Sequence, residues 1–277
     1  MGVLDGFLLS LVFPWNLFFV LGLMLLLAVV FLKARALTLS GAVAAVITGG
    51  LTLWCTGFGG LFMLFFFLVS AGVLGLLTKR HRSEGIEKKT GARDASQVFA
   101  NGFPCLLGAV GWFFTARPLF LLIFTAALAE ANADTWAGEI GRLSSKKPVS
   151  LKTRRPVEAG ISGGVTALGL FGGLLGAVSV AALMCLLFPG ERVLTMAALA
   201  TLCGMLGCVF DSFLGAYAQA QYWDAEHGRL TEIETDSEGR PLELSQGIRW
   251  IDNDTVNLMS NLFSCVLATG LSLASGL

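Results

Sequence analysis

The chain alternates between long apolar runs and short polar segments over most of its length. Eight of the runs are close to the roughly 20 residues that an α-helix needs to cross the hydrocarbon core of a bilayer. They lie at residues 10–32, 36–55, 58–77, 97–116, 118–140, 160–188, 193–218 and 254–275. The pattern therefore predicts about eight transmembrane helices.

Composition supports a membrane protein, because 55% of the 277 residues are hydrophobic and only 14% are charged. The mean hydropathy of +0.75 leaves too little polar surface for a water-soluble domain. We expect an all-α, polytopic membrane helix bundle. Residues 1–85 are expected to form an N-terminal three-helix membrane segment, and residues 86–277 a catalytic membrane bundle with basic cytoplasmic loops. The formal net charge of zero gives no general attraction to nucleic acid.

Basic residues are concentrated in alternate loops of the predicted topology. Four segments hold 17 of the 19 Lys and Arg residues, namely residues 33–35, 78–96, 141–159 and 219–253. Loops enriched in this way face the cytoplasm under the positive-inside rule. We therefore expect an integral membrane protein with both termini outside the cytoplasm and an active site that faces the cytoplasm.

Acidic residues interrupt two of the apolar runs. Glu130 and Asp134 are four residues apart and share one helix face, and Asp211 lies in a later run. A carboxylate at bilayer depth is costly and is tolerated beside a cation, a charged partner or a wet cavity. We interpret Asp134 and Asp211 as metal ligands, with Glu130 as a third ligand or an orienting group. The alternative is that these acids pair with Arg or Lys, or cap helix ends near the membrane surface.

Residue usage narrows the choice of metal. Six cysteines lie in apolar stretches without a CxxC pair, and the chain has only two histidines. Neither a zinc site nor a histidine-rich centre is therefore indicated. Oxygen ligands instead favour a hard cation, Mg²⁺ or Mn²⁺.

Two basic segments precede stretches that are dense in small and polar residues. Their candidates for neutralising phosphate groups are Lys88, Arg93, Lys152, Arg154 and Arg155. The second segment leads to Gly163 and Gly164 at a predicted helix start, where uncovered backbone N–H groups and the helix dipole favour phosphate. The alternative is that basic residues beside a membrane only fix topology and attract anionic lipid.

Asparagines mark the start of two predicted helices. Asn253, Asn257 and Asn261 follow one another at four-residue steps in the last helix, and Asn101 lies near the start of the fourth. A buried amide needs hydrogen-bond partners. We take Asn101, Asn253 and Asn257 as candidates for phosphate or nucleotide binding. The alternative is an interhelical hydrogen-bond ladder that orients the bundle.

Five motifs follow one another along the chain: KKTGARDASQVFANG, EANADTWAGEIG, GISGGVTALG, DSFLGAYAQ and DNDTVNLMSNL. The stretch from about residue 86 to 262 that carries them resembles the integral-membrane family called domain of unknown function 92, which includes plant phytyl-phosphate kinase. The resemblance implies a kinase that converts an isoprenyl monophosphate to the diphosphate with a nucleoside triphosphate, CTP by analogy with phytol and dolichol kinases. Ser162 departs from the Asn expected before the glycine pair, so substrate identity transfers less directly.

We therefore predict a Mg²⁺-dependent lipid phosphate kinase whose partners are CTP or ATP and an isoprenyl phosphate lipid. The same residues would suit a CTP-dependent cytidylyltransferase that makes a CDP-activated lipid. A non-enzymatic lipid or ion transporter is the third hypothesis, because acidic helices also form ion pathways. Against a transporter, the chain has no clear inverted repeat. Acceptor length, nucleotide preference and oligomeric state stay open.

Overall fold

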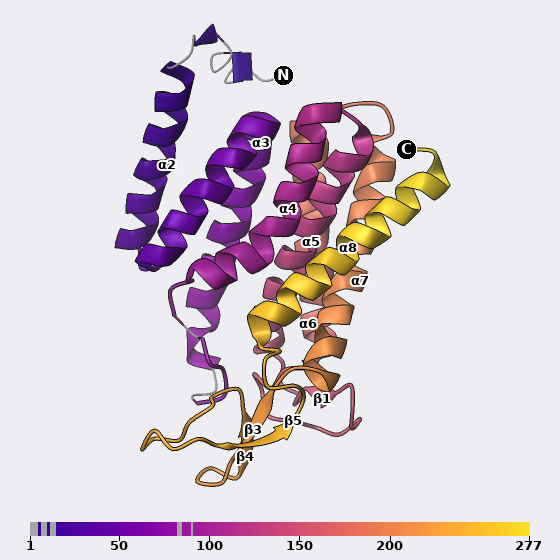
Figure 1. Cartoon of the computed structure of the whole chain (residues 1–277). Helices are drawn as coiled ribbons and strands as arrows, with labels where there is room; N and C mark the ends of the chain where they lie inside the picture. Colours follow the sequence, from indigo (N-terminus) through magenta and orange to yellow (C-terminus); the bar gives the residue numbers. More distant parts are fainter. Residues whose placement is uncertain (1–4, 7–9, 12–14, 82–84, 90) are drawn as a thin grey trace.

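In the computed structural model, the described residues are 5–6, 10–11, 15–81, 85–89 and 91–277. This part of the chain contains seven α-helices that form one bundle (Figure 1). They are α2 (Trp15–Lys33), α3 (Leu39–Thr78), α4 (Ala95–Thr115), α5 (Pro118–Gly141), α6 (Ala167–Leu187), α7 (Val193–Tyr217) and α8 (Asn253–Ser275). A short 3-10 helix, η1 (Lys79–His81), follows α3. The predicted helical membrane bundle is confirmed.

A bend in α3 explains how seven helices supply about eight spans. Gly57 has φ +70° and ψ −165°, far from helical values, and the chain reverses direction there. A Cβ atom built on Gly49 would lie 3.7 Å from Leu61 Cδ1, whereas a straight helix would separate these residues by about 18 Å. Each half of α3 therefore crosses the bundle by itself, in agreement with the predicted runs at 36–55 and 58–77.

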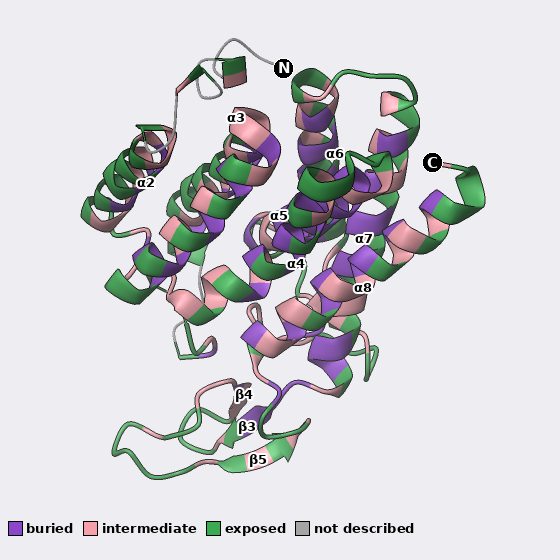
Figure 2. Ribbon diagram, turned by 45° about the horizontal axis from the view of Figure 1, so that its top comes forward, coloured by how far each residue is buried: buried purple, intermediate pink, exposed green. Residues whose placement is uncertain are grey.

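The helix α5 lies at the centre of the bundle. Six helical segments are long and apolar enough to cross a membrane by length and composition, and α5 is not among them because Glu130, Asp134 and Glu139 interrupt it. Every residue of α5 from Leu121 to Ala133 is nevertheless buried, and Figure 2 shows this buried interior surrounded by exposed outer faces. A helix that is buried on all sides belongs to the protein interior.

Glycines let the neighbouring helices approach α5 closely. A Cβ atom built on Gly176 of α6 would lie 2.9 Å from the carbonyl oxygen of Asn132. A Cβ atom built on Gly204 of α7 would lie 2.8 Å from Ala129 Cβ. Small residues at such positions allow backbones to pack in a membrane, where no hydrophobic force drives helices together.

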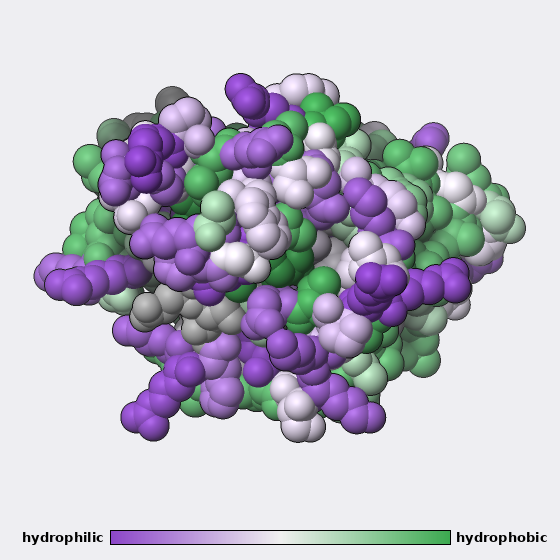
Figure 3. Space-filling view, turned by 90° about the horizontal axis from the view of Figure 1, so that it is seen from below, coloured by the Kyte–Doolittle hydropathy of each residue, from purple (hydrophilic) through white to green (hydrophobic). Residues whose placement is uncertain are grey.

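One end of the bundle carries two small β-sheets, which the purely helical prediction did not include. The first pairs β1 (Val149–Ser150) with β2 (Gly164–Val165). The second is antiparallel and has the order β4 (Arg229–Thr231), β3 (Gln221–Asp224), β5 (Glu243–Gln246). Seen from below, this end is largely hydrophilic (Figure 3).

The four basic loops of the predicted topology meet at this polar end. Leu37 bridges to Arg93, which joins the loop after α2 to the loop before α4. Lys152 Nζ donates to Gln246 Oε1 at 3.1 Å, which joins the loop after α5 to β5. The start of α2 and the end of α8 lie at the opposite end (Figure 1). Which end faces the cytoplasm stays a prediction, as does the division of the chain at residue 85.

Candidate functional site

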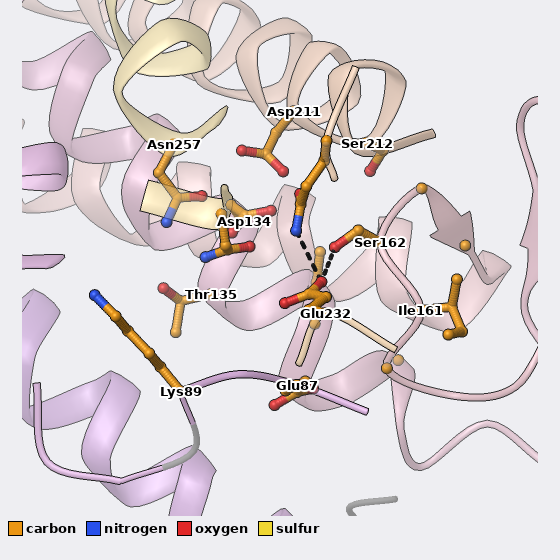
Figure 4. A pocket seen from close by; sticks show the side chains of 18 of the residues that line it. Glu87, Lys89, Asp134, Thr135, Ile161, Ser162, Asp211, Ser212, Glu232 and Asn257 are labelled. Carbon is orange, nitrogen blue, oxygen red and sulfur yellow. Dashed lines mark hydrogen bonds between the residues drawn. The ribbon is translucent and has the colours of Figure 1, made fainter. Parts of the chain in front are cut away.

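A cavity of about 320 Å³ lies where the bundle meets the polar end. Its walls come from the helices α4 to α8 and from the loops that precede α4, α6 and α8 (Figure 4). Nine predicted site residues line it: Lys88, Arg93, Asn101, Asp134, Gly163, Gly164, Asp211, Asn253 and Asn257. Four others do not: Glu130, Lys152, Arg154 and Arg155.

Asp134 and Asp211 line the cavity from α5 and α7, and Asn257 lines it from α8 (Figure 4). Both carboxyl groups belong to partly exposed residues. Among the described residues, neither carboxyl group forms an ion pair with a Lys or Arg side chain. Two carboxyl groups and an amide from three helices therefore border one open space.

Glu130 lies outside this space, with only 1% of its surface exposed. Ser260 Oγ donates to Glu130 Oε1 at 2.8 Å and also lies 3.0 Å from Asp211 Oδ2. Within the described ranges, no three His, Cys, Asp or Glu side chains are grouped so that they could hold a metal ion. Glu130 therefore does not join Asp134 and Asp211 at the cavity wall, and it contacts Asp211 through Ser260. That these carboxyl groups hold a metal ion stays a prediction.

Arg93 and Lys88 bring positive charge to the cavity from the loop before α4. Arg93 Cζ lies 5.0 Å from the centroid of the Phe67 ring, and within the described part of the chain its guanidinium forms no ion pair. Burial lowers the pKa of Arg93, and the nearby Glu139 carboxyl acts in the opposite direction. Lys88 Nζ lies 2.5 Å from Glu234 Oε1, and this hydrogen bond raises the pKa of Lys88.

The second predicted group of basic residues faces away from the cavity. Lys152, Arg154 and Arg155 are exposed, because the chain turns outward between Ser150 and Arg155. Arg154 N donates to Ser150 O at 2.9 Å to close this turn. These three side chains therefore do not line the cavity, and their binding of phosphate stays a prediction.

Three other cations line the cavity: Lys89, which stands beside Lys88 in the first basic segment, and Arg142 and Arg249, which were missed. Lys89 Nζ lies 2.5 Å from Asp254 Oδ2, and Arg142 pairs with Glu87. A sequence signal existed for two of them, because Arg142 directly follows α5 and Arg249 shortly precedes α8. Each stands at the polar end of a helix that carries a candidate site residue.

The glycine pair lines the cavity, but not as a helix start. The helix α6 begins later, at Ala167, so the predicted helix N-terminus at the glycines is wrong. Gly164 N donates to Ile161 O at 3.1 Å and is not free to bind phosphate. Gly163 has φ +80°, and a Cβ atom there would collide with Ala216 of α7. The glycines therefore allow their loop to pack against α7.

Glu232 is a further cavity residue that sequence reasoning missed. Burial is the largest cause that raises its pKa, to about 7, although hydrogen bonds from Ser162 and Gln219 oppose the shift. Gln219 Nε2 donates to Glu232 Oε1 at 2.8 Å, and Ser162 donates to the same oxygen. Ser162, the position at which the family resemblance departs from Asn, therefore holds a carboxyl group of the polar end.

The asparagines divide into cavity residues and one core residue. Asn101 Nδ2 donates to Gln97 O at 3.0 Å, and Asn253 and Asn257 line the cavity. Asn261 is fully buried, and neither polar atom of its side chain has a partner among the described residues. Among the described residues, the side chains of Asn253, Asn257 and Asn261 form no hydrogen bond to another helix, so the alternative of an interhelical ladder is not observed in this part of the chain.

The profile of the integral membrane protein family DUF92 matches residues 22–265. The chain belongs to this family. Membership confirms the resemblance carried by the five motifs. No solved structure matches the chain.

Relatives of this DUF92 chain come from distant organisms. An uncharacterized membrane protein of Methanocaldococcus jannaschii is 32% identical over 196 residues, which cover 69% of this chain and 78% of that protein. Protein PGR of Arabidopsis thaliana is 28% identical over 263 residues, 86% and 89% of the two chains. An uncharacterized membrane protein of Synechocystis is 24% identical over 269 residues, 95% and 93% of the two chains.

Proposed function

We propose that the protein is an integral-membrane phosphotransferase that converts an isoprenyl monophosphate to the diphosphate, with CTP as the phosphoryl donor. One observation carries this proposal: a single cavity is lined by Asp134 from α5, by Asp211 from α7 and by Lys88 and Arg93 from the loop before α4. The cavity lies where the apolar bundle gives way to the polar end. A lipid phosphate and a water-soluble nucleotide can both reach such a place.

The donors in the cavity fit a divalent cation. Carboxylate oxygens from Asp134 and Asp211 and an amide oxygen from Asn257 are hard ligands of the kind that Mg²⁺ and Mn²⁺ prefer. Two nearby carboxylates repel each other, and a cation beside them relieves the repulsion. When bound, such an ion offsets negative charge on a transferring phosphoryl group.

The proposed reaction balances without a covalent enzyme intermediate. A phosphate oxygen of the acceptor attacks the γ-phosphorus of CTP, and the bond from that phosphorus to the bridging oxygen breaks. The products are the isoprenyl diphosphate and CDP. The acceptor oxygen is already ionised, so no strong base is needed. Phosphoryl transfer depends chiefly on positioning and charge stabilisation.

The cations of the cavity have distinct places in this proposal. Arg93, whose guanidinium has no carboxylate partner among the described residues, binds the acceptor phosphate. Lys88, Lys89 and Arg249 border the same cavity and bind the phosphates of the nucleotide. Lys88 and Lys89 already contact acids in the structure, so phosphate would compete with those acids for the two lysines.

The test is an assay of purified protein with Mg²⁺, CTP or ATP and a panel of isoprenyl alcohols and monophosphates. Product masses should show a monophosphate gaining one phosphoryl group, with loss of activity when the cation is chelated. Asp236→Asn is the matched control, because Asp236 is an acid of the polar end that pairs with Arg240 outside the cavity. No diphosphate from any acceptor would refute the proposal.

A further inference from the structure

A second cavity, of about 110 Å³, lies between α2, the two halves of α3 and α4. We call it the apolar groove. Side chains such as Met24, Phe31, Ala45 and Leu64 line it. Phe31, Ala45 and Leu64 remain partly exposed beside the groove. The groove therefore presents a hydrocarbon-like surface within the membrane-spanning part of the protein.

The apolar groove and the polar cavity share three lining residues, Arg93, Gln97 and Asn101. The backbone at Arg93 is fixed, because its N–H donates to Ala36 O at 3.0 Å and its carbonyl accepts from Thr38 N at 3.0 Å. The guanidinium lies over the ring of Phe67, at the junction of the two spaces. A cation in this position suits the phosphate of an amphiphile whose chain lies on the apolar side.

From this continuity, we infer that the apolar groove binds the hydrocarbon chain of a single-chain lipid phosphate while Arg93 holds its headgroup at the edge of the polar cavity. The inference rests on the proposed function and adds the binding site of the lipid acceptor. The groove is much smaller than the polar cavity. Its small size suits one hydrocarbon chain. Charge complementarity with Arg93 selects a phosphate over an alcohol.

The length of the groove limits how much of the chain it holds. Met24 and Phe31 both line it, and seven residue steps from one to the other span about 10 Å along a helix. Near its far end, a Cβ atom built on Gly49 would lie 3.1 Å from Met24 Sδ, so the two helices are in close contact there. The groove therefore holds the first part of a long chain next to the phosphate, and the remainder extends into the bilayer.

Photolabelling of the purified protein without nucleotide tests the site independently of turnover. The probe is an isoprenoid-like monophosphate with a diazirine on the carbon chain near the phosphate, and the matched probe is the corresponding alcohol. Mass mapping should place the label on groove residues such as Phe31, Ala45 and Leu64. Label spread evenly over outward-facing residues would show that lipids only surround the protein, and would overturn the inference.

Variants of the groove sharpen this test. Ala45→Phe should fill the groove and lower phosphate-probe labelling about tenfold, and Leu64→Trp should do the same from the other half of α3. Ile47→Phe is the matched control, because Ile47 lies on the same helix with 46% of its surface exposed and does not line the groove. Unchanged labelling in folded Ala45→Phe and Leu64→Trp proteins would contradict the inference.

A variant of Arg93 separates binding of the phosphate headgroup from binding of the hydrocarbon chain. Arg93→Gln should remove most of the preference for the phosphate probe over the alcohol probe, while labelling of the groove by the alcohol persists. An unchanged preference would contradict the role of Arg93. Groove labelling without any diphosphate product would refute the kinase and leave the lipid site intact, whereas diphosphate formation with label outside the groove would refute the lipid site alone.

Discussion

The helices α5 and α2 are both rich in apolar residues, yet α5 is surrounded by protein and α2 is largely exposed at the outside of the bundle. Every residue of α5 from Leu121 to Ala133 is buried by protein, whereas α2 buries Val20, Met24 and Ala28 and exposes much of the rest. The buried helix carries Asp134, and α2 has no acidic residue. The comparison teaches that an acid in an apolar helix lies where protein walls and an open cavity surround it, while the outer helices remain free to contact lipid.

The largest expected effect comes from neutralising the two cavity acids of the inner helices. Asp134→Asn and Asp211→Asn should each lower kcat by about 100-fold or more, because phosphoryl transfer would lose charge stabilisation worth several kcal/mol. Steady-state assays of the purified variants measure the loss, and Asp236→Asn should keep normal turnover. Near-normal activity in both cavity variants would remove them from the catalytic site.

Packing gives the next largest contrast between inner and outer helices. Gly204→Val should lower stability by about 1–3 kcal/mol, because its Cβ would lie 2.8 Å from Ala129 Cβ. Gly22→Val on α2 is the matched change, since a Cβ atom there meets no atom within 4 Å. Thermal unfolding in detergent measures both. Equal losses of stability would show that α2 is packed as tightly as α7.

Substituting one basic residue inside the cavity and one outside it tests where the lipid phosphate binds. Arg93→Gln should raise KM for the lipid phosphate about tenfold, since one charge-assisted contact contributes roughly 1.4 kcal/mol. Arg154→Gln should change KM less than twofold, because Arg154 is exposed and does not line the cavity. A large effect of Arg154 alone would move the phosphate site to the loop after α5.

The smallest effect should come from Glu232 and depend on pH. Its pKa is raised in the folded protein from 4.5 to about 7, so the folded state holds this proton more tightly than the unfolded state. Stability should therefore fall as pH rises from about 4.5 to 7 and level off above that range. Glu232→Gln should flatten this part of the profile by a few degrees in Tm. An unchanged profile would show that Glu232 is not buried as described.

Sequence periodicity predicted the spans well, because the bilayer imposes a length and an apolar composition that a single run of residues displays. It even separated the two halves of α3, whose reversal depends on the positive φ of Gly57. Asp134 and Asp211 were also found, since an acid in an apolar run is conspicuous. The small sheets were missed because β3 to β5 are only three or four residues long.

The cationic lining was harder to predict because side-chain direction depends on distant contacts. Arg154 and Arg155 are close in sequence to the cavity glycines, yet a local turn directs them into solvent. Arg249 reaches the cavity from a loop that follows the sheet. Glu232 is brought there by β4, and no periodic pattern in its polar segment marks it. Proximity along the chain was therefore a poor guide to proximity in space.

The central claim is that one cavity transfers a phosphoryl group from a nucleotide to a membrane lipid phosphate. Its most direct measurement supplies the purified protein with Mg²⁺, a lipid monophosphate and CTP labelled at either the α- or the γ-phosphorus. We predict that γ-label appears in the lipid diphosphate and that α-label stays in CDP. Transfer of α-label to the lipid would identify a cytidylyltransferase, and lipid movement across vesicles without nucleotide consumption would identify a transporter; either result would contradict the claim.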